Sequence, residues 1–298
     1  MSLKGFVGCI TAIVTPFKKN LEVDYEGLRQ LIRFQLENNV SGIVVLGTTG
    51  ESPTITEEER KQILKVAVDE ANGKIPVIAG TGTYSTAESI RMTKEASEIG
   101  VDGALIVAPY YNKPTQEGLY RHFKAIAESV DLPIILYNIP GRTGVNIDVL
   151  TEARLLEIDN IVSIKEASGN MQQIMDIISM TKNDKTILSG DDNLTLPIMA
   201  CGGKGVISVV SNLLPKQVCD LVNNILEGNL SKAREIHYNL MPIFKAAFLE
   251  TNPIPIKTAM NLVGLPAGPC RPPLCEMSQQ NLDKLKSVIK RYYEIPVH

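Results

Sequence analysis

The chain alternates short apolar runs with longer amphipathic segments. The runs are rich in β-branched residues and show little polar alternation, which is typical of parallel strands covered on both faces. Eight such runs occur, at residues 8–17, 42–47, 75–82, 103–111, 132–140, 160–168, 185–192 and 205–212. The pattern therefore predicts eight buried strands.

The intervening segments carry helix signals. Apolar residues recur at helical spacing in residues 24–39, at Leu28, Leu31, Ile32 and Leu36. Thr56 with Glu59, and Ser85 with Glu88, have the spacing of capping boxes. Similar patterns predict helices at residues 115–130, 148–158, 171–182 and 214–229.

Eight strand–helix units predict an α/β fold of the (β/α)₈ TIM-barrel type rather than a doubly wound sheet. After about Leu214 no further strand pattern occurs, and residues 231–250, 255–264 and 275–295 all look helical. We therefore expect a catalytic barrel domain at residues 1–225 and a C-terminal helical domain at residues 226–298.

Composition excludes several classes of protein. The 298 residues are 44% hydrophobic and carry a net charge of −3, so no basic surplus points to nucleic acid or to an anionic membrane. The N-terminal apolar run is interrupted by Thr11, Thr15 and Pro16, and no run reaches the length of a membrane span. These features predict a cytoplasmic protein.

The cysteines and histidines give no metal or disulfide pattern. The five cysteines include no C-x-x-C pair, and His122, His237 and His298 are far apart in the sequence. We expect neither a metal nor a cofactor, and we expect Cys270 and Cys275 to be free thiols, although an interface role stays open.

Chemistry in a TIM barrel lies at the C-terminal ends of the strands. Lys165 stands at such an end. Because side chains alternate along a strand, Lys165, Ile161 and Ser163 should point into the barrel. The side chains of Val162, Ile164 and Glu166 should then point toward the helices. A buried amine has a lowered pKa and can attack a carbonyl group. A lysine that reaches water or pairs with Glu166 is an equally good interpretation of this stretch alone.

Tyr137 favours the catalytic interpretation. It shares a strand face with Ile135 and Ile139, on the strand that neighbours Lys165 in a barrel. A phenol at the same depth as the amine can pass protons. Taken alone, Tyr137 is also compatible with a core tyrosine whose hydroxyl is hydrogen-bonded.

Other strand ends offer anion-binding groups. The "GTTG" turn at residues 47–50 can bind a carboxylate or be a plain turn, and Arg142 can clamp a carboxylate or lie free at the surface. We interpret "GDDNL" at residues 190–194 as a helix N-cap rather than a metal site. No complete nucleotide-binding motif occurs.

In combination, "GTTGESPTI", "APYYNKPTQEGLYRHFKAIAE", "LYNIPGRTG", "IKEASGN", "LSGDD" and "NPIPIKTAMNLVG" make the chain similar, over essentially its whole length, to the pyruvate-dependent class I aldolase/N-acetylneuraminate lyase family. Within it, the chain most resembles the dihydrodipicolinate synthases. The resemblance implies a lyase of lysine (diaminopimelate) biosynthesis. This lyase would condense pyruvate with L-aspartate 4-semialdehyde to give 4-hydroxy-tetrahydrodipicolinate.

The resemblance also implies residue roles. Lys165 would form a Schiff base with pyruvate, and Tyr137 would donate and accept protons. Thr48 and Tyr111 would complete a proton relay, with Tyr111 supplied by a neighbouring subunit of a homo-oligomer, commonly a tetramer of two dimers. The substrate-binding residues would be Thr49, Arg142, Ile207 and Gly190.

Two comparisons within that family sharpen the prediction. Sialic acid lyases have a serine at the position of Thr48 and lack the arginine, so Thr48, Tyr111 and Arg142 favour the synthase. Ser52, Glu88 and Tyr110 match the site at which regulated synthases bind lysine. Three other positions of that site depart from the pattern of strongly inhibited enzymes, so the resemblance implies weak or absent inhibition by lysine; they are Glu57, Arg60 and Tyr84.

Overall fold

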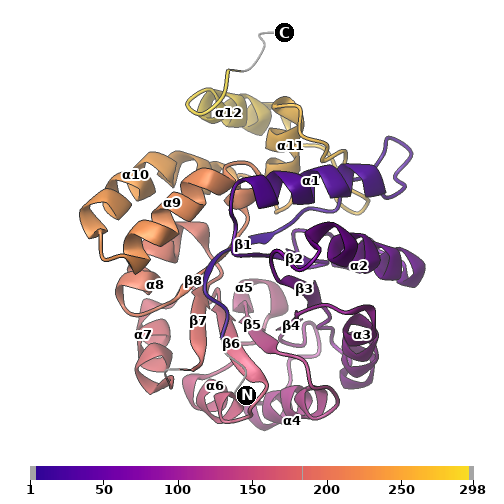
Figure 1. Cartoon of the computed structure of the whole chain (residues 1–298), viewed down its shortest axis with the longest axis vertical. Helices are drawn as coiled ribbons and strands as arrows, with labels where there is room; N and C mark the ends of the chain where they lie inside the picture. Colours follow the sequence, from indigo (N-terminus) through magenta and orange to yellow (C-terminus); the bar gives the residue numbers. More distant parts are fainter. Residues whose placement is uncertain (1–4, 183, 295–298) are drawn as a thin grey trace.

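The computed structural model describes residues 5–182 and 184–294. In this part of the chain eight parallel strands form a closed barrel, with β8 paired to β1 (Figure 1). The predicted TIM barrel is therefore confirmed. Its strands are β1 (Gly8–Ala12), β2 (Gly42–Val45), β3 (Val77–Gly80), β4 (Gly103–Val107), β5 (Ile134–Asn138), β6 (Ile161–Glu166), β7 (Thr186–Ser189) and β8 (Gly205–Ser208).

Helices surround the barrel, and each of the predicted helical segments contains one. They are α1 (Tyr25–Glu37), α2 (Glu57–Ala71), α3 (Thr86–Ile99), α4 (Gln116–Ala127), α5 (Pro140–Thr143), α6 (Val149–Leu156), α7 (Met171–Met180), α8 (Thr195–Ala200), α9 (Pro215–Leu226), α10 (Leu230–Ala246), α11 (Ile254–Leu262) and α12 (Gln279–Ile289). The predicted capping box at Thr56 is complete. At Ser85 only half forms, because the Glu88 carboxylate pairs with Arg91.

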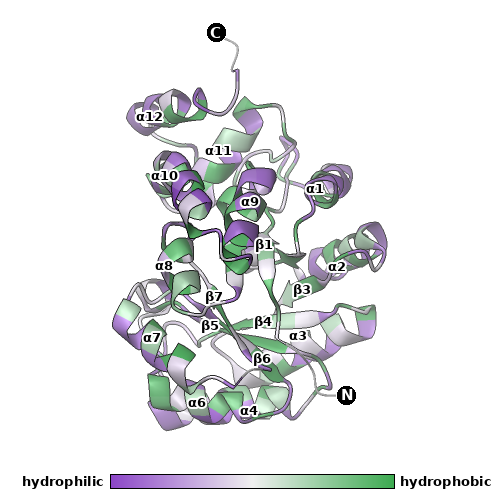
Figure 2. Cartoon of the chain, turned by 60° about the vertical axis from the view of Figure 1, so that its left-hand side comes forward, coloured by the Kyte–Doolittle hydropathy of each residue, from purple (hydrophilic) through white to green (hydrophobic). Residues whose placement is uncertain are grey.

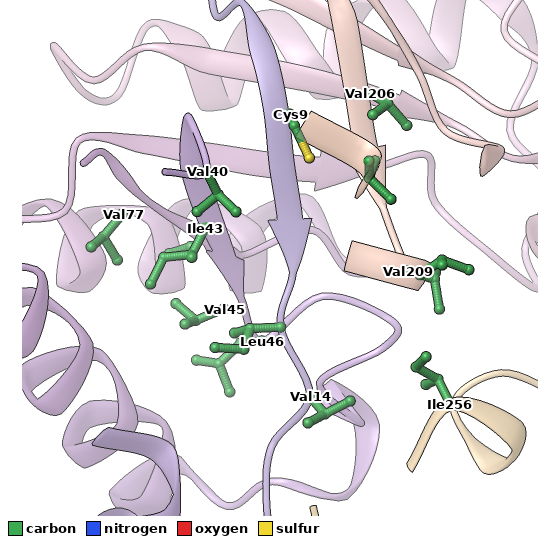
Figure 3. Close-up of a cluster of buried hydrophobic side chains, with 14 of the residues drawn as sticks. Cys9, Val14, Val40, Ile43, Val45, Leu46, Val77, Val206, Val209 and Ile256 are labelled. Atoms are coloured by element: carbon green, nitrogen blue, oxygen red, sulfur yellow. The ribbon is translucent and has the colours of Figure 1, made fainter. Parts of the chain in front are cut away.

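Two apolar clusters fill the molecule. A small one inside the barrel includes Ile10, Val44, Leu188 and Ile207, and a large one lies between the strands and the helices. Helices such as α9 and α10 carry both apolar and polar residues, as amphipathic helices do (Figure 2). Figure 3 shows part of the large cluster, which reaches from β2 to Ile256 of α11.

A β-bulge corrects one strand-parity prediction. Ile134 of β5 pairs with Ile161, but the next residue, Ile135, pairs with Ser163. Ile161 therefore belongs to the outer cluster and not to the barrel interior. The bulge lies below Lys165, so the inward orientation predicted for Ser163 and Lys165 is unaffected.

The C-terminal helices pack beside the barrel. Helix α10 contacts α9 and α12, and α11 contacts α12. The predicted division at residue 225 falls within α9 and stays a prediction, and residues 295–298 of the predicted C-terminal domain lie outside the described residues. A buried ion pair joins this region to the barrel: Lys257 Nζ of α11 lies 2.7 Å from Glu51 Oε1, in the turn after β2.

Candidate active site

Lys165 and Tyr137 face each other inside the barrel mouth. They are directly opposite in the β5–β6 pairing, and Lys165 Nζ lies 4.0 Å from the centre of the Tyr137 ring. Both side chains are buried. Burial lowers the pKa of Lys165 to about 8, against the opposing effect of the nearby Asp191 and Asp192 carboxylates. Near pH 7 roughly a tenth of such an amine is the uncharged nucleophile.

Tyr137 has the opposite protonation behaviour. Burial raises the pKa of its phenol, and the positive charge of Arg142 and a hydrogen bond with Thr48 oppose that rise only in part. The phenol is therefore protonated at neutral pH. An uncharged amine beside a protonated phenol is a pairing suited to attack on a carbonyl with proton transfer.

A cavity of roughly 610 Å³ opens at this end of the barrel. Thr48, Tyr137 and Arg142 all line it, so three of the predicted site residues come together. Arg142 lies in the one-turn helix α5, directly after β5. From this turn the charge of Arg142 acts on Tyr137, whose pKa it lowers against the effect of burial.

A C-terminal residue that was not singled out from the sequence supports this site. Asn252 donates a hydrogen bond from Nδ2 to the Thr49 hydroxyl at 3.0 Å, and its backbone carbonyl accepts one from Arg142 Nη2 at 3.2 Å. Asn252 is buried and lies just before α11. Thr49 and Arg142, the two predicted carboxylate-binding residues, are thus hydrogen-bonded to the same residue, one to its side chain and the other to its backbone.

The "GDDNL" segment does not cap a helix as predicted. Asp191 makes no side-chain capping bond, and Asp192 Oδ2 accepts from the backbone N–H groups of Val209 and Val210, each at 3.0 Å. Burial raises the pKa of Asp191 to about 6, while the charge of Lys165 opposes the rise. The two acids therefore belong to the electrostatic environment of Lys165.

The remaining predicted residues occupy different places. Ile207 lies in the inner apolar cluster with Tyr137, and Gly190 follows β7 and donates its N–H to the Glu166 carbonyl at 2.6 Å. Tyr111 does not line the cavity. Its side chain is 90% exposed, and its backbone has a left-handed φ of 72°.

Comparison with known proteins identifies this arrangement. Residues 5–292 match the dihydrodipicolinate synthetase family. The chain belongs to this family. The resemblance predicted from sequence is confirmed, and with it the class, a lyase of the class I aldolase type.

Individual relatives cover nearly the whole chain. The 4-hydroxy-tetrahydrodipicolinate synthase of Methanocaldococcus jannaschii is 54% identical over 96% of this chain and 98% of its own length. That of Protochlamydia amoebophila is 53% identical, over 97% and 96%. The crystal structure of dihydrodipicolinate synthase from Aquifex aeolicus superimposes with a TM-score of 0.94 at 52% identity, over 96% and 98% of the two chains.

The cavity extends past Tyr137, whereas Lys165 is not among the residues that line it. Its far end is lined by Ser52, Arg60, Tyr84 and Glu88. Arg60 is buried and donates to the Gly80 carbonyl and to the Ser52 hydroxyl, each at 2.8 Å. The Glu88 carboxylate is held by Arg91.

The described residues give three further findings. They contain no cluster of three or more His, Cys, Asp or Glu side chains placed to hold a metal ion. No helix among them is long and apolar enough to cross a membrane. The five cysteines are free thiols there, including Cys270 and Cys275.

Proposed function

We propose that this chain joins pyruvate to L-aspartate 4-semialdehyde through a Schiff base on Lys165, giving 4-hydroxy-tetrahydrodipicolinate for lysine and diaminopimelate biosynthesis. The observation that carries the proposal is the buried Lys165 amine, with its pKa lowered to about 8, beside the protonated Tyr137 phenol. The identity of the relatives supports the choice of reaction.

The chemistry begins at the uncharged Lys165 amine. Its nitrogen attacks the ketone carbon of pyruvate, and loss of water from the carbinolamine gives the Schiff base. Loss of a proton from the methyl group then gives an enamine, whose methylene carbon attacks the aldehyde carbon of the second substrate. The amino group of that substrate displaces Lys165 as the ring closes, which regenerates the free enzyme.

Protons move through hydroxyl groups in this scheme. Tyr137 donates to the oxygen that leaves as water and accepts a proton in later steps, with Thr48 as its hydrogen-bonded partner. Tyr111 completes the relay from a neighbouring subunit. Its near-complete exposure supports such a role, since the side chain does not line the cavity of its own chain.

Two carboxylates have to be bound. The turn at Thr48 and Thr49, with the backbone of Ile207 and Gly190, binds the carboxylate of pyruvate. Arg142, at the cavity wall, binds the carboxylate of L-aspartate 4-semialdehyde. A guanidinium suits that task because its paired N–H groups match a carboxylate.

We also infer a homo-oligomer, with a tetramer of two dimers as the expected form, and a cytoplasmic location. The need for Tyr111 from a second subunit supports the first inference. The five free thiols suit a reducing compartment and support the second. The reaction needs no metal or cofactor beyond the covalent Schiff base.

One experiment tests the function. The protein is incubated with pyruvate, reduced with borohydride, and analysed by mass spectrometry. A stable adduct on Lys165 is expected, and Lys165→Met should abolish it. Lack of an adduct would overturn the proposal. Turnover of L-aspartate 4-semialdehyde then separates the synthase from a sugar-acid lyase or from a keto-acid sensor.

A further inference from the structure

The turn that follows β2 carries two of the predicted site residues. Its Gly50 N–H donates to the Gly47 carbonyl and its Glu51 N–H donates to the Thr48 carbonyl, each at 3.1 Å. Thr48 lines the cavity, and Thr49 is buried. The positions of both threonine hydroxyls therefore depend on the conformation of this turn.

Glu51 closes the turn in an unfavourable backbone conformation. Its φ of 54° and ψ of 36° are left-handed, which is costly for a residue other than glycine. Leu46, on the other side of the turn, also has a left-handed φ, of 59°. Such conformations persist only where the surrounding structure determines them. Contacts from outside the turn are therefore needed to hold it.

The Glu51 carboxylate is bound on both oxygens by the C-terminal region. Lys257 Nζ donates to Oε1 at 2.7 Å, and the Arg271 backbone N–H donates to Oε2 at 2.8 Å. The side chains of Glu51 and Lys257 are both buried. One donor on each oxygen fixes the direction of the carboxylate, and with it the orientation of Glu51 in the turn.

Lys257 is itself held by three acceptors. Besides the Glu51 carboxylate, its ammonium donates to the backbone carbonyls of Thr15 and Pro269, at 3.0 and 2.6 Å. It also lies 4.4 Å from the centre of the Phe17 ring. An ammonium has three N–H groups, so its hydrogen-bonding capacity is fully used. The Lys257 ammonium therefore has one defined position.

Thr15 connects the same lysine to the neighbouring residue of the turn. Its hydroxyl donates to the Gly50 carbonyl at 2.7 Å, while its backbone carbonyl accepts from Lys257. Thr15 is buried, and a Cβ at Gly50 would lie only 3.3 Å from its hydroxyl oxygen. Two consecutive residues of the turn are thus held from outside it, Gly50 by Thr15 and Glu51 by Lys257.

We propose that Thr15, Glu51 and Lys257 form a buried clamp that positions the turn after β2 for the reaction. The hydroxyls of Thr48 and Thr49 are the groups whose positions it sets. The three members are positioning residues, because they reach the substrate site only through the turn. The role in catalysis rests on the proposed function, whereas the restraint on the turn does not.

Stability alone does not account for this arrangement. Apolar side chains of similar size can often replace a buried ion pair without loss of stability. Apolar side chains could not, however, hold Glu51 in its left-handed conformation through hydrogen bonds to both carboxylate oxygens. The observed bonds are directional, as a device that fixes a conformation requires.

Glu51→Gln tests the clamp through the rate at which the borohydride-trapped pyruvate adduct forms. The amide keeps the size of the side chain but has one acceptor oxygen for two donors, Lys257 and the Arg271 N–H. The turn should shift, and the adduct should form up to about 100-fold more slowly at saturating pyruvate. The pyruvate concentration at half-maximal rate should also rise, because Thr49 belongs to the proposed pyruvate-binding turn. A wild-type adduct rate would overturn the proposal.

Lys185→Met is the matched control. Lys185 is a buried lysine just before β7, at the end of the barrel opposite the cavity, and its ammonium donates to three backbone carbonyls at between 2.8 and 3.1 Å. Its loss should lower stability and leave the adduct rate unchanged, at a temperature where circular dichroism shows all variants folded. An equal loss of rate in this control would overturn the positioning role, because destabilisation alone would then slow the reaction.

Glu51→Gln/Lys257→Met separates positioning from stability. The double variant leaves no unpaired charge, so it should resist urea better than Lys257→Met. It does not restore the clamp, so its adduct rate should stay as low as that of Lys257→Met. Recovery of the wild-type rate together with stability would overturn the proposal.

Thr15→Val decides the question if the charge variants do not fold. Valine has nearly the shape of threonine and keeps the backbone carbonyl that Lys257 binds, but it lacks the hydroxyl that holds Gly50. Loss of this one hydrogen bond should slow adduct formation roughly 2- to 10-fold. A wild-type rate in Thr15→Val would overturn the clamp.

Amide hydrogen exchange tests the restraint on the turn without reference to the reaction. The N–H groups of Gly50 and Glu51 should exchange about tenfold faster in Glu51→Gln than in the wild type, and at the wild-type rate in Lys185→Met. Unchanged exchange in Glu51→Gln would overturn the clamp. If the wild type forms no pyruvate adduct, the proposed function fails, while this measurement still decides whether the clamp holds the turn.

Discussion

Asn252 and Thr49 are joined by a hydrogen bond across 203 residues of sequence, with Asn252 Nδ2 3.0 Å from the Thr49 hydroxyl. The bond fixes the turn after β2 from the C-terminal region. Since the Asn252 carbonyl also accepts from Arg142, one residue contacts both of the proposed carboxylate-binding groups. The C-terminal extension therefore takes part in building the active site.

Asn252→Ala should weaken pyruvate binding. Loss of the hydrogen bond leaves the buried Thr49 hydroxyl without its partner, which costs about 1–3 kcal/mol and should raise the KM for pyruvate roughly 5- to 150-fold. Steady-state kinetics measure this. Asn261→Ala is the control, since the Asn261 side chain bonds the Gly268 backbone in the same region. An unchanged KM for pyruvate in Asn252→Ala would contradict the role.

The rate of pyruvate adduct formation should depend on pH through Lys165. The uncharged amine increases as pH rises, so the rate should rise and level off above about pH 8. The negative charge of Asp191 raises the pKa of Lys165, and Asp191 is ionised above its own pKa of about 6. Asp191→Asn should therefore move the midpoint to lower pH.

Borohydride trapping at a series of pH values measures both midpoints. Asp220→Asn provides the control, because Asp220 lies on α9 in an exposed pair with Lys216. Its midpoint should equal that of the wild type. A midpoint for Asp191→Asn that stays in place or moves to higher pH would show that Asp191 does not act on Lys165.

Lysine should be a poor inhibitor. At the far end of the cavity the Arg60 guanidinium is buried, and the Glu88 carboxylate is already paired with Arg91. A lysine ammonium entering there would meet a positive charge and no unpaired carboxylate of Glu88. Initial rates should be unaffected by sub-millimolar lysine, whereas Arg60→His should increase sensitivity. Strong inhibition of the wild type in this range would rule out the prediction.

Much of the fold, and the positions of Lys165 and Tyr137 within it, could be predicted from the sequence because the signals are local. Parallel strands covered on both faces appear as apolar runs, and strand parity alone aims Lys165 and Tyr137 into one space. Parity failed at Ile161, since a bulge is set by packing between strands and leaves no trace in alternation. It holds again from Ser163 onward, which is why the facing positions of Lys165 and Tyr137 were predicted correctly.

The missed residues depend on distant contacts. Asn252 gains its role from residues that are over a hundred positions away. The helix-cap prediction for "GDDNL" failed for the same reason, because the backbone groups that Asp192 binds belong to residues 209 and 210.

The buried pair of Glu51 and Lys257 should dominate the coupling between barrel and C-terminal region. Both side chains are 1% exposed, and Lys257 also donates to the carbonyls of Thr15 and Pro269. Lys257→Met leaves the Glu51 carboxylate buried without its cation, which should reduce the free energy of unfolding by about 3–5 kcal/mol. Urea denaturation at pH 7 measures this change.

The exposed Lys216–Asp220 pair is the matched control, and Lys216→Met should cost at most about 1 kcal/mol. The double variant Glu51→Gln/Lys257→Met should lose less than the sum of the two single variants, because it leaves no unpaired charge. Additive losses would mean that the two side chains stabilise the protein independently of each other.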